Sequence, residues 1–140
     1  ATFGSLNRNK KSIILDLKSE KGVAAAIALA ADADVLIENF RPGTMDRLGL
    51  GYNKLSALNP RLVYCSVTGF GGTGPYAKRP GYDTVGQAMG GLLSVLTDLE
   101  APTGMGISLS DHLTGMMAAY GCLGALAARD PFTQRGVRGT

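Results

Sequence analysis

Residues 34–43 read DVLIENFRPG, an apolar run that ends in a polar turn containing a proline. The run at 34–38 predicts a buried strand, because short β-branched and apolar stretches bounded by turn residues are typical of strands. A short helix is predicted to follow over 43–48. The turn between them contains Phe40 and Arg41, so an aromatic ring and a cation lie just after the carboxyl end of the strand.

The flanking segments repeat this pattern on both sides. SIILDL at 12–17 predicts another buried strand, and Ser19 can cap a helix over 20–32 that has an apolar stripe at helical spacing. A helical turn over 53–58 ends at Asn59-Pro60, and RLVYCSV at 61–67 predicts a third strand. Alternating strands and helices predict an α/β fold, a Rossmann-like, mostly parallel sheet with flanking helices.

The second half of the chain has a different composition. A loop of glycines and prolines at 69–81, GFGGTGPYAKRPG, precedes helical stretches over about 82–97 and 110–129. Glycine costs up to about 1 kcal/mol in a helix interior, so the glycines there predict close packing against a helix, a subunit or a ligand. They are Gly86, Gly90, Gly91, Gly115, Gly121 and Gly124.

Composition and charge exclude several classes of protein. With 45% hydrophobic and 18% charged residues the chain is typical of a globular domain. A net charge of +3 is too small and scattered for a nucleic-acid groove, but it suits a small anionic ligand. The apolar stretch 116–128 is shorter than the ~20 residues of a membrane span. We expect no nucleic-acid or membrane partner and a cytoplasmic location, with the mitochondrial matrix or peroxisome as alternatives.

The two cysteines, Cys65 and Cys122, lie in apolar settings without the spacing of zinc ligands. They predict reduced core thiols, and we expect no metal site.

The chain begins ATFGSLNRNKKS without a methionine and ends RGVRGT, a polar turn that predicts a further element. We therefore expect residues 1–140 to be part of a longer protein, with strand and helix repeats over 1–68, the loop 69–81 and packed helices over 82–129.

The loop GFGGTG at 69–74 matches the dinucleotide-binding pattern G-x-G-x-x-G. That fingerprint requires a helix to open at the motif and an acidic residue about 20 positions later. Here Pro75 and Pro80 block the helix, and position 94 is Ser94. The sequence therefore argues against a nicotinamide or flavin site.

Polar residues gather where the predicted strands end. Ligands of open α/β sheets bind beyond the carboxyl ends of the strands. A face offering Lys18, Arg41 and Arg47, with Phe40 for stacking, suits a ligand that has phosphates and an aromatic base. Ordinary solvated loop charge explains the same residues equally well.

Asp111 and the single histidine, His112, stand at the start of the last predicted helix, in GISLSDHLTGMMAAYG. Asp111 can be a helix cap, although Ser110 beside it could serve as well. It can also be a nucleophile, since a carboxylate can attack an activated acyl group to form a mixed anhydride. The helix N-terminus would keep it ionised, and its free N–H groups could support an oxyanion. His112 could orient it or face solvent.

Five ordered blocks resemble the class III CoA-transferases, a family that includes formyl-CoA transferase, carnitine CoA-transferase and α-methylacyl-CoA racemase. The blocks are NRNKKSIILDLKSEKG (7–22), ADVLIENFRPGTMDRLGLGY (33–52), NPRLVYCSVTGFGGTGPY (59–76), GYDTVGQAMGG (81–91) and SDHLTGMMAAYGCLGAL (110–126).

The resemblance implies a transferase that moves CoA between an acyl-CoA thioester and a carboxylic acid. It makes Asp111 the nucleophile, first acylated and then carried as an aspartyl-CoA thioester. It implies CoA or acyl-CoA as a substrate rather than a permanently bound cofactor. The positions that match CoA-binding residues are Leu15, Asp16, Leu17, Lys18, Asn39, Phe40, Arg41, Arg47 and the segment Pro80, Gly81, Tyr82 and Asp83.

Two departures from the family pattern bear on function. Pro80 stands where relatives have a lysine, so Lys78 or Arg79 would supply that charge. Tyr82 stands where racemase relatives have an acid/base histidine, which favours transfer over racemisation. An isomerase of the same family and a non-catalytic CoA-binding fragment remain the alternative functions.

The resemblance also implies parts outside residues 1–140. These are N-terminal CoA contacts, a smaller second domain and a glycine loop over the active site. Members of the family form interlocked homodimers, so it implies a homodimer here as well.

Overall fold

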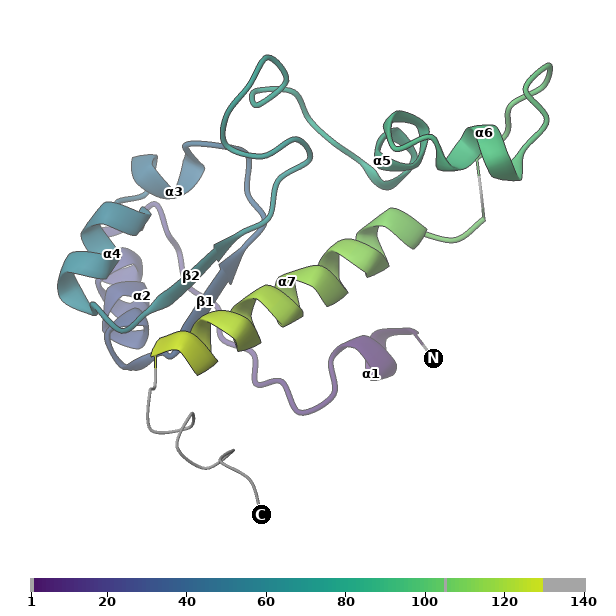
Figure 1. Cartoon of the computed structure of the whole chain (residues 1–140). Coiled ribbons are helices and arrows are strands. Elements are labelled where there is room, and N and C mark those ends of the chain that lie inside the picture. The colour runs from purple at the N-terminus through teal and green to yellow at the C-terminus, as the bar shows by residue number, and fades with distance from the viewer. Residues whose placement is uncertain (1, 105, 130–140) are drawn as a thin grey trace.

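The computed structural model describes residues 2–104 and 106–129. The turn expected over 135–140 lies outside these residues. Of the helices described, none combines the length and the hydropathy that a bilayer crossing demands. The elements follow in the order α1 (Thr2–Leu6), α2 (Glu20–Asp32), β1 (Val35–Glu38), α3 (Thr44–Arg47), α4 (Tyr52–Leu58), β2 (Val63–Ser66), α5 (Asp83–Met89), α6 (Leu92–Leu96) and α7 (Leu109–Arg129) (Figure 1).

The strands β1 and β2 form a two-stranded parallel sheet. Val35 is paired with Val63 and Glu38 with Ser66, so both strands end at the same edge. The connection between them runs through α3 and α4, as a parallel crossover requires. The predicted α/β fold is confirmed.

The strand predicted over 12–17 is wrong. Residues 11–16 have no regular secondary structure, and Ile13 and Ile14 are 65% and 96% exposed. A strand exists only through hydrogen bonds to a neighbour, and within the described part of the chain this segment has no strand beside it. An apolar, β-branched sequence shows a preference for extended backbone, but it does not supply the partner.

The helix α2 begins where the sequence predicted, because Ser19 caps it. The Ser19 hydroxyl accepts a hydrogen bond from the Gly22 N–H (3.1 Å) and donates one to the Asp16 carbonyl (2.8 Å). One backbone N–H that would otherwise be unpaired in the first turn of α2 is therefore satisfied, and the turn is connected to the preceding segment at Asp16.

The hydrophobic core lies between the sheet and the helices α2, α3 and α4. Its buried members come from these helices and the turns beside them, and Leu36 and Tyr64 of the strands pack against them. Leu55 of α4 is the most deeply buried, at 1% exposure. The buried residues of this cluster are Ala30, Met45, Leu50, Leu55 and Leu62.

The long helix α7 covers the other side of the sheet, running from the carboxyl edge of the strands to their amino edge (Figure 1). Cys122 of α7 is buried and lies beside Cys65 of β2, and both are free thiols. Burial raises the pKa of the Cys65 thiol, and the neighbouring Cys122 thiol raises it further. The predicted placement of both cysteines in apolar packing is confirmed for Cys122, whereas Cys65 is only half-buried.

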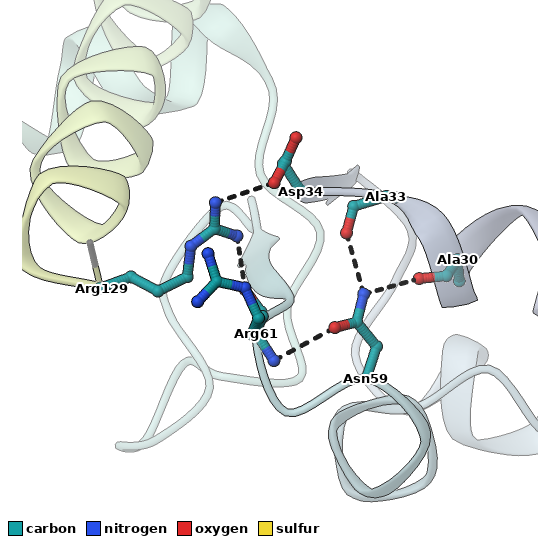
Figure 2. A network of polar contacts seen from close by, with 6 residues as sticks. All are labelled: Ala30, Ala33, Asp34, Asn59, Arg61 and Arg129. Carbon is teal, nitrogen blue, oxygen red and sulfur yellow. Dashed lines mark hydrogen bonds and ion pairs between the residues drawn. The ribbon is translucent and has the colours of Figure 1, made fainter. Parts of the chain in front are cut away.

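Polar contacts anchor the C-terminal end of α7 at the amino edge of the sheet (Figure 2). The Arg129 guanidinium forms an ion pair with Asp34 (2.8 Å) and donates to the Arg61 carbonyl (2.7 Å). Next to it, the Asn59 amide donates to the carbonyls of Ala30 (3.2 Å) and Ala33 (2.9 Å). These bonds join α7, the entrance to β2 and the end of α2.

The helix predicted over 82–97 is two helices, α5 and α6. Gly91 has φ +77°, a left-handed conformation that breaks a right-handed helix and that glycine adopts without steric cost. Gly86 explains the close packing predicted from the glycines, since a Cβ there would lie 3.2 Å from the Ser110 Cβ of α7. In contrast, a Cβ at Gly115, Gly121 or Gly124 would meet no described atom within 4 Å apart from the backbone of its own helix.

The Ser19 cap gives a test of the fold. Replacing Ser19 with alanine leaves the first-turn amide of α2 without its acceptor, so Ser19→Ala should lower the free energy of unfolding by about 1 kcal/mol. Urea unfolding of the intact protein measures it. The matched control is Ser56→Ala inside α4, where the hydroxyl makes only a 3.4 Å bond to Asn53 and alanine favours the helix. Equal losses for the two variants would contradict the capping role.

Candidate functional site

The turn after β1 is held against the end of β2 by side-chain hydrogen bonds. The Asn39 amide donates to the Val67 carbonyl (2.6 Å). The Glu38 carboxylate accepts from the Phe40 N–H (2.8 Å) and from the Ser66 hydroxyl. Because both strand ends are tied together, the residues that follow β1 are presented at a fixed place beyond the carboxyl edge of the sheet.

The glycine loop 69–81 starts and ends at the same point. A Cβ on Gly69 would lie 2.5 Å from the Gly81 Cα, so only glycine allows the two backbones to come so close. Within the loop, the Tyr76 ring packs edge-on against Phe70 with centroids 5.6 Å apart. The Arg79 guanidinium lies over the Tyr76 ring, 4.4 Å from its centroid. The loop is therefore closed at its base, and its cation is oriented by an aromatic ring.

Asp111 lies in the first turn of α7, where α5 meets it. Its backbone N–H donates to the Asp83 carboxylate (3.1 Å), so Asp83 of α5 caps α7 from outside the helix. The Asp111 side chain is exposed, and its carboxylate is not used as the cap. A cap from Asp111 or Ser110 was one of the alternatives left open by the sequence, and here a residue 28 positions earlier accepts from the first turn.

His112 does not orient Asp111 in this structure. Its ring Nδ1 lies 2.6 Å from the Ser108 carbonyl oxygen, one turn back along the chain. Its backbone N–H donates to the same carbonyl (3.1 Å). The histidine is therefore directed toward the beginning of α7.

Two adjoining cavities open beyond the carboxyl edge of the sheet, with volumes of about 280 and about 380 Å³. Arg41, Lys78 and Arg79 line the first cavity, whereas the second has no basic side chain in its wall and includes the apolar Val67, Phe70 and Val85. Asp111 lines both. An exposed carboxylate thus stands between a cationic compartment and a more apolar one.

Nine of the predicted site residues meet at the first cavity. They come from the turn after β1, the end of the glycine loop, the start of α5 and the start of α7. They are Asn39, Phe40, Arg41, Arg79, Pro80, Gly81, Tyr82, Asp83 and Asp111. Lys78 and Arg79 both line this cavity, so either cation can take the place of the lysine that relatives have at position 80.

The other predicted site residues lie elsewhere. Lys18 and Arg47 line a separate open cavity of about 530 Å³ beside α2. Leu15 and Leu17 line another, of about 330 Å³, to which Phe40 also contributes. Asp16 has a local structural role, since its carboxylate accepts from the Lys18 N–H (3.0 Å). Phe40 is thus shared between the candidate site and the cavity of Leu15 and Leu17, whereas the cavity of Lys18 and Arg47 shares no lining residue with the site.

Sequence reasoning missed Gln87, which lies behind the cavities. Its side-chain nitrogen donates to the Asp83 carboxylate (2.5 Å), four residues earlier in α5, and to the Ile107 carbonyl (3.2 Å). The only available signal was a polar residue one helical turn after Asp83. That spacing predicts a contact within the helix, but it does not predict the bond to Ile107.

Comparisons with known proteins show which family the chain resembles. The family model described as CoA-transferase family III matches residues 1–138. The acetyl-CoA:oxalate CoA-transferase of Acetobacter aceti is 47% identical over 130 residues, which cover 91% of this chain and 33% of the relative. The succinyl-CoA:glutarate CoA-transferase of Mus musculus is 42% identical over 122 residues, covering 86% and 28%. The chain therefore spans about a third of the length of these relatives.

A solved structure agrees in fold. The crystal structure of a CAIB/BAIF family protein from Brucella suis has a TM-score of 0.84 and 44% sequence identity. The likeness covers 88% of this chain and 33% of that one.

The closed base of the glycine loop can be tested directly. A methyl group at position 81 would meet the Gly69 Cα, so Gly81→Ala should force the two ends apart and loosen the loop. We expect tryptic cleavage after Lys78 to become several-fold faster. Gly72→Ala is the matched control, because a Cβ at Gly72 meets nothing within 4 Å. Similar cleavage rates for both variants would show that the contact does not hold the loop.

Proposed function

The chain belongs to CoA-transferase family III, and we propose that its Asp111 carries the covalent steps of CoA transfer between an acyl-CoA thioester and a carboxylic acid. The observation that supports this most is the position of Asp111, exposed in the first turn of α7 on the wall shared by the two cavities. The cationic cavity suits the phosphates of CoA, and the apolar one suits an acyl group or the pantetheine arm.

The proposed reaction has four steps without net uptake of water or protons. An Asp111 oxygen attacks the carbonyl carbon of the donor thioester, the C–S bond breaks, and CoA leaves as a thiolate from a mixed anhydride. The thiolate attacks the Asp111 carbonyl carbon, giving an aspartyl-CoA thioester and releasing the donor acid. The acceptor carboxylate then attacks that thioester and expels the thiolate, which finally attacks the acceptor carbonyl and frees Asp111.

The start of α7 supports the charge that this chemistry requires. An ionised carboxylate in the first turn interacts favourably with the helix dipole. The amides of Leu109, Asp111 and His112 already donate to the Ile107 carbonyl, Asp83 and the Ser108 carbonyl. We propose the remaining first-turn amide, that of Ser110, as a donor to the oxyanion of the tetrahedral intermediates.

CoA recognition is proposed for the residues that meet at the first cavity. Arg41 and Arg79 would bind phosphate oxygens, and Phe40 offers a half-exposed ring against which an adenine could stack. Lys18 and Arg47 line the separate cavity beside α2, and we propose them as further phosphate contacts. The relatives named above are transferases of oxalate and glutarate, which supports a small carboxylic acid as acceptor. The homodimer and the cytoplasmic location remain predictions.

Replacing Asp111 tests the nucleophile. Asp111→Ala in the intact protein should lower the transfer rate by about 1,000-fold or more, because no attacking oxygen remains at this position. Incubation of the unmodified protein with acyl-CoAs should also give a hydroxylamine-sensitive adduct on the peptide that contains Asp111, detected by mass spectrometry.

The matched control for this variant is Asp98→Ala, which removes an exposed carboxylate outside both cavities. It should transfer CoA at the unmodified rate. Full turnover by a folded Asp111→Ala protein would refute the assignment. Exchange of the substrate α-proton with deuterated water would instead favour an isomerase.

The cationic cavity makes a separate prediction about binding. Arg41→Ala removes a charge-assisted contact to phosphate, so the dissociation constant for CoA should rise about tenfold in calorimetric titrations. Lys54→Ala, which removes a cation from α4, should leave affinity unchanged. If the two variants bind CoA equally well, Arg41 does not contact the ligand.

A further inference from the structure

Gln87 is the one polar side chain among the described residues that is buried, with 1% exposure. It lies at the junction of α5 and α7, behind the cavities rather than in their walls. Its side-chain nitrogen makes two hydrogen bonds, whereas its Oε1 has no partner in the described structure. Buried polar groups are normally paired, so a half-satisfied amide calls for an explanation.

The orientation of the amide follows from its neighbours. Both groups beside Nε2 are acceptors, the Asp83 carboxylate at 2.5 Å and the Ile107 carbonyl at 3.2 Å. Turning the amide over would place Oε1 against two other oxygens and lose both bonds. The unpaired oxygen is therefore a consequence of directing both hydrogens toward the beginning of α7.

The two bonds reach Asp111 by different routes. The first holds the Asp83 carboxylate, whose other oxygen accepts from the Asp111 N–H at 3.1 Å. The second holds the carbonyl of Ile107, two residues before α7 begins. Gly86, next to Gln87, has no side chain, so α5 can approach Ser110 closely enough for both hydrogen bonds to form. The entrance to α7 is thus tied to one buried amide at two points, on either side of Leu109.

We infer that Gln87 is a positioning residue for the proposed nucleophile: through Asp83 and Ile107 it sets where the Asp111 carboxylate stands between the two cavities. An apolar residue of similar size would fill the same space without an unpaired oxygen, so filling space alone does not explain an amide here. The inference rests on the proposed function of Asp111.

The test compares Gln87→Met with Asn59→Leu in the intact protein. Each change replaces a buried or half-buried bridging amide with an apolar side chain of similar size. Asn59 joins α2 to the entrance of β2 at the amino edge of the sheet (Figure 2), whereas Asp111 lies beyond the carboxyl edge. Both variants should lose stability, but only Gln87→Met should lower kcat, by about 10- to 100-fold with KM within about twofold, because misplaced reacting groups slow chemistry more than binding.

Two further measurements separate positioning from general damage. The rate of adduct formation on Asp111 in a single turnover should fall by the same factor as kcat. Hydrogen exchange of the Asp111 amide should become faster in Gln87→Met and stay unchanged in Asn59→Leu. If Gln87→Met does not fold, Gln87→Leu is a second apolar replacement that lacks both donors, and it should show the same loss of kcat.

The outcomes distinguish this inference from the proposed function. Adduct formation at an unchanged rate in folded Gln87→Met overturns the inference alone. Equal losses of kcat in Gln87→Met and Asn59→Leu also overturn it, because they would show an effect of stability only. Turnover of the unmodified protein without any adduct on Asp111 overturns the proposed function, and the inference with it.

Discussion

The parallel pairing of β1 and β2 is the constraint on which the candidate site depends. Parallel strands end at the same edge, so the turn after β1 and the glycine loop after β2 leave the sheet side by side. Glu38 and Asn39 then form hydrogen bonds with Ser66 and Val67, and these bonds fix the two chain segments relative to each other. The long helix α7 runs back over the sheet and places its N-terminal turn at that same edge (Figure 1). The site therefore forms where two strand ends and one helix start converge.

Much of this arrangement could be predicted from the sequence because it depends on local patterns. The apolar run at 34–38, the Ser19 cap and the Asn59-Pro60 stop each act within a few residues, and the helices and strands they predict are present. The meeting of residues 39–41 with the glycine loop was also predictable, since the carboxyl ends of parallel strands lie at one edge, whereas only the resemblance to the family placed Asp111 beside them.

The errors have physical causes outside the local pattern. The segment 12–17 has the composition of a strand, but a strand requires a partner that composition does not provide. The break at Gly91 depends on a left-handed backbone that a helical pattern of apolar residues conceals. The cap on α7 comes from Asp83, 28 positions before Asp111, and Gln87 donates a hydrogen bond to the Asp83 carboxylate. Such contacts become visible only when two helices are placed against one another, so the sequence indicated the proposed nucleophile but not the groups that hold it.

The balance of apolar and polar contacts differs between the two halves of the chain. Around α2, α3 and α4 a small core of buried side chains determines the packing. Along α7, by contrast, Met117, Tyr120 and Leu123 are each more than half exposed, and Cys122 is the buried member of the helix. Among the described residues α7 packs on β2 and α5, and directional contacts hold its two ends, to Asp83 near the site and to Asp34 at the far edge. Hydrogen bonds and ion pairs contribute modest stability, but their geometry is strict. A long helix held at both ends by such contacts keeps its first turn in register with the sheet, and that register is what places Asp111 between the cavities.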